Sequence, residues 1–412
     1  MVVNHLYYND AQPAGTPSQS FSFSPKLLQQ ALQNIYGPSF DPEKDIEPTF
    51  WQTFTKAFNQ AADQGFSQSS YNPSQAFTSA LRHSNAVFAA FKTHRLQNDL
   101  AQLLTDSNGN LKPFQQWKKD ILPIASHQCQ HWLQTEYDTA VLRAHQAADW
   151  QQFQAEKDVL PNLRWMPSTS PNPGADHLPF WNTVLPVDHP FWDQHRPGDR
   201  WNCKCSLSAT DDPATSVPTA PASSAGGNRP HPGLDTNPGK TAQLFSNTHP
   251  YIKNAYPGAK EAVEKAVSKA EENERHWTKV RDLLKSGRFP VVPGRNQYME
   301  HNNLYSGKLC VTTKKLRHLL AHTHTEEQKN AAEYIWNHPE QLHSPIKKDM
   351  EEYYRGIGMP EDVMKKKIEK KKKERKVVCY YYYKFSFKGE EWQAYLEYDE
   401  QGRESIYMVD KK

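Results

Sequence analysis

The sequence predicts an α+β multidomain protein: a mainly α-helical N-terminal unit with a loop-rich Trp/His/Cys end, a linker, and an α+β domain with a C-terminal antiparallel β-meander. Three observations predict this class. Apolar residues recur at helical spacing through much of residues 25–160. Residues 211–243 are rich in Pro, Ala, Ser and Gly, a composition typical of linkers. Beyond residue 376 the apolar pattern changes to the alternation of strands. The expected divisions are 1–24, 25–210, 211–243 and 244–412.

The first unit is expected to be built from helices. Residues 1–24, rich in Asn, Gln, Ser and Pro, are predicted to be a flexible arm. Pro25 suits the first turn of a helix, and Gly37-Pro38 ends it. Further helices are expected at 48–63, 73–103 and 113–160. We interpret the following apolar stripe as core: Trp117, Ile121, Trp132, Tyr137, Val141, Ala144, Ala148 and Phe153.

The second unit is expected to begin near Leu244 with helices at 258–286, 313–322 and 325–337. Three strands should follow, with the sequences KVVCYYYYKFSF, EWQAYLEY and ESIYMV. Lys388-Gly389 and Gln401-Gly402 are expected to make the turns between them.

Composition limits the setting more than the partner. A net charge of +3 on 412 residues is too mild to indicate a ligand. Five cysteines do not form a disulfide framework in a chain of this length, which favours a reducing compartment. The opening MVVNHLYYND lacks a secretion signal, and no apolar run approaches a membrane span, so we expect synthesis in a cytoplasm and no membrane partner.

The segment PFWNTVLPVDHPFWDQHRPGDRWNCKCSL, residues 179–207, has neither helical nor strand periodicity. His177, His189, Cys203 and Cys205 are candidate ligands of a structural zinc ion, with His195 as a competing ligand. Alternatively, the cysteines pack as small apolar groups and the histidines cap loops. We interpret the tryptophans of this segment as its core rather than as a nucleic-acid stacking platform: Trp181, Trp192 and Trp201.

Residues 110–210 combine three groups of residues: Tyr137, Arg143, Ala147 and Trp150; then Leu163-Arg164-Trp165; and then Pro197-Gly198 leading into the Cys203-x-Cys205 pair. With this combination the stretch resembles the phage Mu F-like minor head proteins, a head morphogenesis family. The resemblance implies a few-copy capsid component in the virion head, made in the host bacterial cytoplasm. The implied partners are portal and head proteins, and the implied roles are head assembly, DNA packaging or ejection. No cofactor is required for them.

The second unit is rich in histidine. His318 and His322 lie four residues apart, on one face of a predicted helix. Without a HExxH arrangement they do not point to a metal, but imidazoles near cations suit metal-independent RNA cleavage, which needs a base, an acid and a positive charge at the phosphate. The candidate catalytic residues are His318, His322, Lys348, Arg403 and Tyr407.

The order of helices, basic segment and meander over residues 245–412 resembles the barnase–EndoU–colicin–RelE-like phage nuclease domains, which occur fused behind Mu F-like head proteins. The resemblance implies an RNase-like effector and, for a toxin, an immunity protein as partner. Two alternatives stay open. The second unit can be a structural domain that binds the portal, DNA or capsid subunits, or the whole chain can be a polymorphic-toxin carrier.

The run KKKIEKKKKERK holds nine basic residues against two acidic ones. Such runs are usually solvated helix ends, but this one can also be a phosphate-binding stripe for RNA or DNA. The candidate contacts are Lys365, Lys366, Lys367, Lys370, Lys371, Lys372, Lys373, Arg375 and Lys376.

Overall fold

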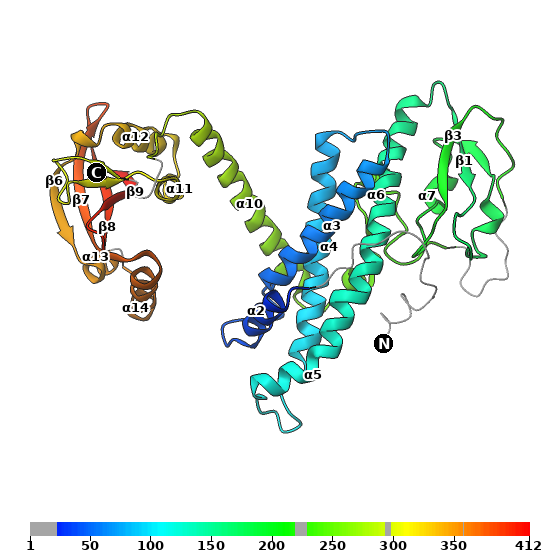
Figure 1. The fold of residues 1–412 in the computed structure, drawn as a ribbon, viewed down its shortest axis with the longest axis horizontal. Coiled ribbons are helices and arrows are strands. Elements are labelled where there is room, and N and C mark those ends of the chain that lie inside the picture. The colour runs from blue at the N-terminus through cyan, green and yellow to red at the C-terminus, as the bar shows by residue number, and fades with distance from the viewer. Residues whose placement is uncertain (1–22, 219–228, 293–297, 357) are drawn as a thin grey trace. The chain divides into compact units, whose positions relative to one another are not determined.

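The computed structural model describes residues 23–218, 229–292, 298–356 and 358–412 (Figure 1). The fold class is as predicted. The chain forms two compact units, Met1–Lys269 and Ala270–Lys412. Their boundary lies within helix α10 (Ala259–Lys285) rather than at the predicted linker. Most of the predicted arm, residues 1–22, and residues 219–228 of the predicted linker lie outside the described residues.

Unit 1, Met1–Lys269, is built around a helical core. The predicted helices are present, and their bounds are α2 Pro25–Tyr36, α3 Pro48–Gln68, α4 Gln75–Ala101, α5 Phe114–Ser126, η1 His127–Trp132 and α6 Leu133–Glu156. The expected single helix over 113–160 is therefore interrupted. Pro123 lies inside α5, and the π-helical turn η1 follows directly. Because proline supplies no backbone N–H and crowds the preceding turn, it disturbs the regular ladder.

The end of the first unit, which was expected to be rich in loops, contains a small antiparallel sheet of order β2–β1–β3. Its strands are β1 Asn162–Met166, β2 Val184–Pro186 and β3 Ser206–Thr210, joined by the short helices η2 Leu178–Phe180 and α7 Phe191–Gln194. Figure 1 shows it beside α6. Trp165 and Trp192 are fully buried in its core and Trp201 is buried in the helical core, while Trp181 is partly buried. Of the three tryptophans expected to form the core of this segment, Trp192 does so, whereas Trp201 packs into the helical core and Trp181 is partly buried.

Residues 231–253 belong to unit 1 and pack against its helices, although part of this stretch was expected to be linker. It carries the short helices α8 Pro238–Thr241 and α9 Pro250–Lys253. Leu234, Leu244 and Tyr251 are buried in the helical core. Gly239 lies directly over the Trp150 side chain, so that a Cβ there would sit 2.6 Å from the indole Cγ. Composition alone misses this packing because few but well-placed apolar residues anchor the segment.

Unit 2, Ala270–Lys412, contains a six-stranded sheet of order β4–β5–β9–β8–β7–β6. The three predicted strands are β7 Val377–Phe387, β8 Glu390–Asp399 and β9 Glu404–Lys411, and they form the antiparallel meander. Three further strands join it: β4 Tyr298–Glu300, β5 Lys308–Cys310 and β6 His343–Lys348. The β5–β9 pair is parallel.

Helices cover both faces of this sheet. One face packs its Trp392, Leu396 and Ile406 against α11 Thr313–Leu320 and α12 Glu326–Asn337. The other face carries Tyr380 and Tyr407 under α13 Met350–Gly356 and α14 Glu361–Lys370. The remaining helical turns are η3 Pro339–Gln341 and η4 Lys371–Arg375. None of the described helices in either unit is long and apolar enough to cross a membrane.

Candidate functional site

Unit 1 holds a buried group of three metal-ligand side chains, His177, Cys203 and Cys205, which we call the cysteine site. His177 precedes η2, and the cysteines lead into β3. The His177 Nδ1 atom lies 3.5 Å from the Cys203 Sγ and 3.8 Å from the Cys205 Sγ. All three ligand atoms lie within 4.8 Å of one another.

The cysteine site fits a tetrahedral zinc ion. Bond lengths of about 2.1 Å to nitrogen and 2.3 Å to sulfur place neighbouring ligand atoms about 3.6 Å apart in a tetrahedron. The two nitrogen–sulfur distances given above bracket this value. Among the described residues no fourth side chain joins the group, so a fourth ligand would come from elsewhere.

Shared protons set the charges of the three side chains in the cysteine site. The hydrogen bond from Cys203 lowers the pKa of Cys205 to about 5, against the effect of burial, and the His177 hydrogen bond contributes in the same direction. The shared proton and burial raise the pKa of Cys203. Burial lowers the pKa of His177, but hydrogen bonds to Asp199 and Cys205 outweigh it and raise the pKa to about 9. Cys205 is therefore a thiolate at neutral pH, whereas Cys203 and His177 each hold a proton that a metal ion would have to displace.

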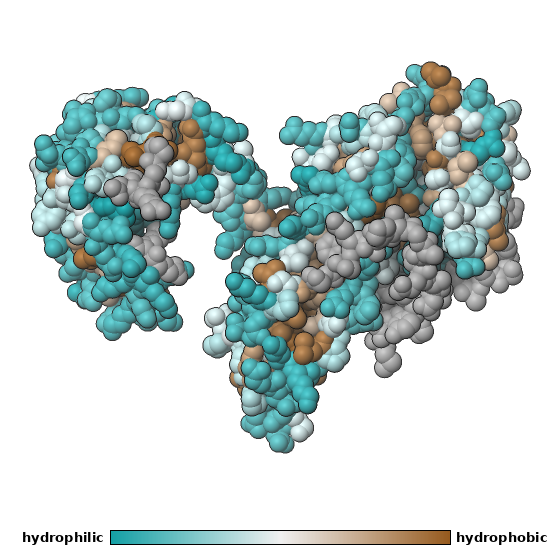
Figure 2. Space-filling view, in the orientation of Figure 1, coloured by the Kyte–Doolittle hydropathy of each residue, from teal (hydrophilic) through white to brown (hydrophobic). Residues whose placement is uncertain are grey.

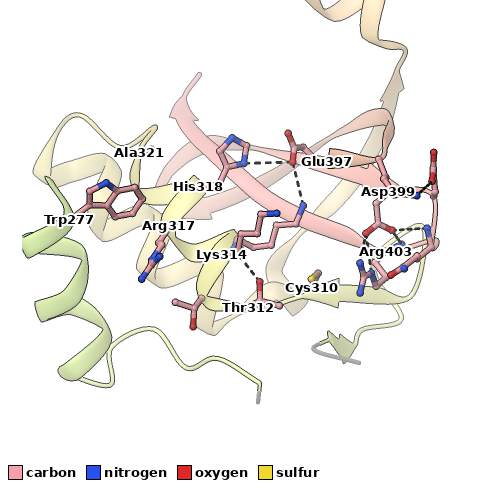
Figure 3. Close-up of a pocket in the computed structure, with 15 residues that line it drawn as sticks. Trp277, Cys310, Thr312, Lys314, Arg317, His318, Ala321, Glu397, Asp399 and Arg403 are labelled. Carbon is pink, nitrogen blue, oxygen red and sulfur yellow. Dashed lines mark hydrogen bonds and ion pairs between the residues drawn. The ribbon is translucent and has the colours of Figure 1, made fainter. Parts of the chain in front are cut away.

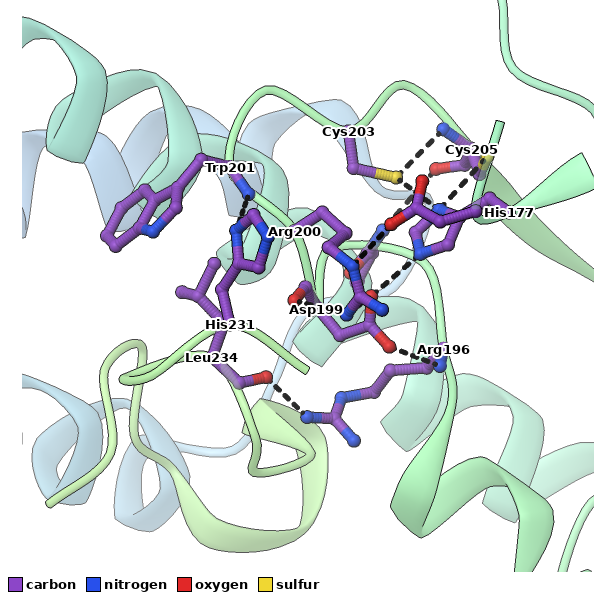
Figure 4. A network of polar contacts seen from close by, with 12 residues as sticks. His177, Arg196, Asp199, Arg200, Trp201, Cys203, Cys205, His231 and Leu234 are labelled. Carbon is purple, nitrogen blue, oxygen red and sulfur yellow. Dashed lines mark hydrogen bonds and ion pairs between the residues drawn. The ribbon is translucent and has the colours of Figure 1, made fainter. Parts of the chain in front are cut away.

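Asp199 orients His177 from behind (Figure 4). Its Oδ1 lies 2.8 Å from the His177 Nε2 and accepts a hydrogen bond from the Arg200 Nη1 at 3.2 Å. Its Oδ2 accepts the backbone N–H of Arg196. Asp199 is fully buried. A carboxylate on the far nitrogen of a histidine ligand is the usual outer partner in zinc sites, because it fixes the ring and raises its basicity.

Of the predicted ligands, His177, Cys203 and Cys205 form the cysteine site, and His189 and His195 are not part of this group. The His189 Nδ1 accepts the backbone N–H of Phe191 at 3.1 Å and so caps α7. The His195 ring packs against Phe180 and Phe191, with centroid distances of 4.8 and 5.3 Å. Sequence spacing could not separate these histidines, because only the folded loop decides which one faces the cysteines.

Arg143 ties the parts of unit 1 together. Its buried guanidinium donates to four backbone carbonyls, those of Leu244, Gly198, Leu234 and Thr236. Gly198 belongs to the loop of the cysteine site, and the other three carbonyls belong to the segment of residues 231–253. Arg196 donates to the Leu234 carbonyl as well, at 2.7 Å. A single buried cation therefore fixes α6, the cysteine loop and the following segment.

Unit 2 holds a pocket of about 840 Å³, which we call the C-terminal pocket (Figure 3). Its lining includes five cationic side chains, those of Lys314, Lys315, Arg317, Lys376 and Arg403. His318 lines it too, together with the carboxylates of Glu397, Asp399 and Glu400 and the indole of Trp277. The cations outnumber the carboxylates, so the pocket favours an anionic ligand.

Glu397 is the buried centre of this pocket. Its carboxylate lies 2.7 Å from the Lys371 Nζ, 3.4 Å from the Lys315 Nζ and 3.7 Å from the His318 Nδ1. Burial raises the pKa of Glu397, but the charges of Lys371, Lys315 and His318 outweigh it and hold the pKa at about 2. Glu397 is therefore a carboxylate that orients His318.

The rings of His318, His322 and Tyr407 lie close together, although only His318 of the three lines the C-terminal pocket. The His318 ring is stacked on Tyr407 at 5.6 Å, and the His322 ring lies 5.1 Å from His318 and 5.7 Å from Tyr407. In the β8–β9 pairing Tyr395 opposes Met408 and Leu396 opposes Ile406, so Tyr407 is the extra residue of a β-bulge. A bulge re-aims the side chain that it carries.

The other two predicted catalytic residues differ from each other. Arg403 lines the C-terminal pocket and is held by Asp399 through two hydrogen bonds, of 3.0 and 2.8 Å. Lys348 does not line the pocket, because it lies on β6, three positions from β9 in the sheet, and pairs with Glu352. Its catalytic assignment stays a prediction.

The basic run forms α14 and η4. Lys365, Lys366, Lys367, Lys370, Lys372 and Lys373 are exposed, and the surface around α14 is mainly hydrophilic in Figure 2. Lys371 differs from these exposed lysines, because its Nζ donates hydrogen bonds to Glu397 and to the Tyr380 hydroxyl, both at 2.7 Å. Lys376 lines the C-terminal pocket and pairs with Glu400. The side chain of Arg375 lies outside the described residues.

Several residues of these sites escaped the sequence analysis, among them Asp199, Glu397 and Trp277. Glu397 stands in no motif with its partner His318, because the two lie 79 residues apart along the chain. The one available signal was Glu397 itself, a charged residue between Leu396 and Tyr398 in the apolar and aromatic middle of β8.

The fold and the two sites define a two-unit α+β protein with a His/Cys group in its helical unit and a cationic pocket in its second unit. Residues 96–208 match the family model described as Phage Mu protein F like protein. The matched stretch runs from α4 to β3 and contains the whole cysteine site and Arg143. The chain therefore carries a phage Mu protein F-like region there. No curated protein and no solved structure matches the chain.

Proposed function

We propose that the chain is a minor head protein of a phage or prophage, a component of the virion head with the portal and other head proteins as partners. The observation that carries this proposal is the Mu F-like match, which contains the cysteine site and Arg143. The host bacterial cytoplasm is where the chain is made and where heads assemble.

This proposal is tested by purifying heads from the phage or prophage that encodes the chain. We expect an antibody against the chain to detect a few copies per head, and deletion of its gene to reduce the yield of infectious particles. Heads that contain no copy and assemble normally without the gene would overturn the proposal.

We propose as a second function that unit 2 cleaves RNA without a metal. Groups of the required types lie near one another in it. His318 lines the C-terminal pocket with Glu397 behind it, His322 lies beside His318 outside the lining, and the cations belong to the pocket. In the proposed reaction His318 takes the proton of a ribose 2′-hydroxyl, and the 2′-oxygen attacks the neighbouring phosphorus. The bond from phosphorus to the 5′-oxygen breaks, and His322 protonates the leaving oxygen. The lining cations balance the charge that develops on the phosphate.

RNA cleavage by the full chain, in the presence of a chelator, tests the second function. We expect His318→Ala and His322→Ala each to lower the rate of RNA cleavage at least a hundredfold. His338→Ala is the matched control, because His338 is exposed and pairs with Glu340 away from the pocket. Histidine variants that cleave as well as wild type would remove the assignment. A folded wild-type chain that does not cleave leaves unit 2 with the alternative role of binding nucleic acid or capsid partners.

A further inference from the structure

The C-terminal pocket has an aromatic end that the cleavage chemistry does not use. Trp277, from α10, is half-buried and lines the pocket. The Arg317 guanidinium lies over its ring, 5.3 Å from the centroid. In Figure 3 these two side chains lie at one end of the lining and Asp399 and Arg403 at the other, while His318 and Glu397 lie between them.

Arg317 is an exposed cation that pairs with no carboxylate among the described residues. Its interaction with Trp277 therefore leaves its charge uncompensated by any described acidic side chain. An indole face beside an uncompensated guanidinium matches two parts of a nucleotide, because an aromatic ring stacks on a base and a guanidinium pairs with a phosphate.

We propose that Trp277 and Arg317 form a subsite for an unpaired base next to the phosphate that faces His318, and that the substrate of unit 2 is single-stranded RNA. This proposal rests on the second function above. The base stacks on the indole of Trp277, and Arg317 turns from the ring to the neighbouring phosphate. A paired base cannot do this, since its faces are covered within the duplex. The pocket volume of about 840 Å³ is large enough for more than one nucleotide.

Binding of labelled oligonucleotides to the full chain tests the subsite without cleavage. The probe is a 2′-O-methyl RNA strand, which has no free 2′-hydroxyl and so resists the proposed reaction, offered single-stranded or annealed to its complement. We expect tighter binding of the single strand. Trp277→Ala should weaken that binding about tenfold to a hundredfold, whereas Trp277→Phe keeps most of it. Arg317→Gln should weaken it as well.

Arg281→Gln is the matched control, because Arg281 is an exposed arginine of α10, the helix of Trp277, that pairs with Glu274 and does not line the pocket. Thermal unfolding of Trp277→Ala shows whether the variant is folded. Should single strand and duplex bind equally well, or a folded Trp277→Ala bind like wild type, the subsite is overturned.

Cleavage of the unmodified strand, measured in parallel, separates the two proposals. Binding that depends on Trp277 without any cleavage supports the subsite and contradicts the nuclease. Cleavage whose KM is unchanged in Trp277→Ala supports the nuclease and contradicts the subsite.

Discussion

His249 shows what complete burial does to a single ionisable side chain. It is fully buried beside Phe88 and Tyr251, and its Nδ1 accepts the backbone N–H of Tyr251. Burial, with a contribution from the charge of Lys92, lowers the pKa of His249 to about 3. The folded state therefore holds the His249 ring in its neutral form, and protonation of the ring destabilises the folded state.

This pKa predicts how the stability of unit 1 depends on pH. Above about pH 6.5 the ring is neutral in both states, so His249 adds no pH dependence. Between pH 6.5 and 3 only the unfolded chain takes up the proton, so the free energy of unfolding should fall by about 1.4 kcal/mol per pH unit from this group. His249→Asn keeps a capping acceptor and should remove this part of the slope in calorimetric unfolding curves. His338→Gln, in unit 2, is the control. An unchanged slope in His249→Asn would contradict the assignment.

The cysteine site gives a prediction about metal content. Protein purified without chelator should contain about one zinc per chain, and Cys205→Ser should lose it. His189→Gln is the informative control, because His189 was a predicted ligand that the structure places at a helix cap instead. It should keep its zinc. Elemental analysis decides the matter, and equal loss of zinc in both variants, or no zinc in wild type, would contradict the three-residue site.

At the scale of elements, long periodic segments were predictable and short ones were not. The β7–β8 hairpin followed from its alternation and from Lys388-Gly389, which adopt φ values of 54° and 79°, as a tight hairpin turn requires. Strand β6 was missed because it contains a proline and is largely exposed. The strands β2, β4 and β5 have three residues each, too few for any period to show. In the same way, the pairing of His318 with His322 was readable from helical spacing, whereas Glu397 and Asp199 reach their partners only through tertiary folding.

The contact between α3 and α6 depends on one small residue. A Cβ on Gly65 would lie 2.6 Å from the Ala144 Cβ and 2.8 Å from the backbone N of His145. Gly65→Ala should therefore push the two helices apart and lower the stability of unit 1 by about 1–3 kcal/mol. Gly356→Ala is the matched control, since nothing lies within 4 Å of a Cβ at Gly356. Thermal unfolding of both variants tests the contact, and a Gly65→Ala variant as stable as wild type would show that the helices do not pack this closely.

At the scale of the whole molecule, unit 2 carries two sets of cationic side chains, one in the C-terminal pocket and one exposed on α14 and η4. The cations of the C-terminal pocket surround carboxylates, and Lys371 is committed to Glu397 and Tyr380. The exposed lysines of α14 and η4 are not gathered around a buried carboxylate in this way. Lys365 pairs with the exposed Glu361. If unit 2 binds RNA, these lysines should supply long-range attraction while the pocket supplies the chemistry.

If the exposed lysines attract RNA and the pocket cleaves it, variants of the two sets of residues should have opposite effects on binding and on cleavage. Replacing Lys365, Lys366, Lys370, Lys372 and Lys373 by glutamine should weaken RNA binding and flatten its dependence on salt, by roughly 0.7 in log–log slope for each phosphate of a single strand that is no longer neutralised. Cleavage of bound RNA should stay near wild type, because no proton-transfer group has changed. His318→Ala should do the reverse, with the salt slope kept and cleavage abolished. Lys371→Gln belongs to neither class: it leaves the buried Glu397 without its nearest cation, so it should lower the stability of unit 2 first. A salt slope that survives the five replacements would show that the basic run is a solvated helix end, and that the pocket alone attracts the nucleic acid.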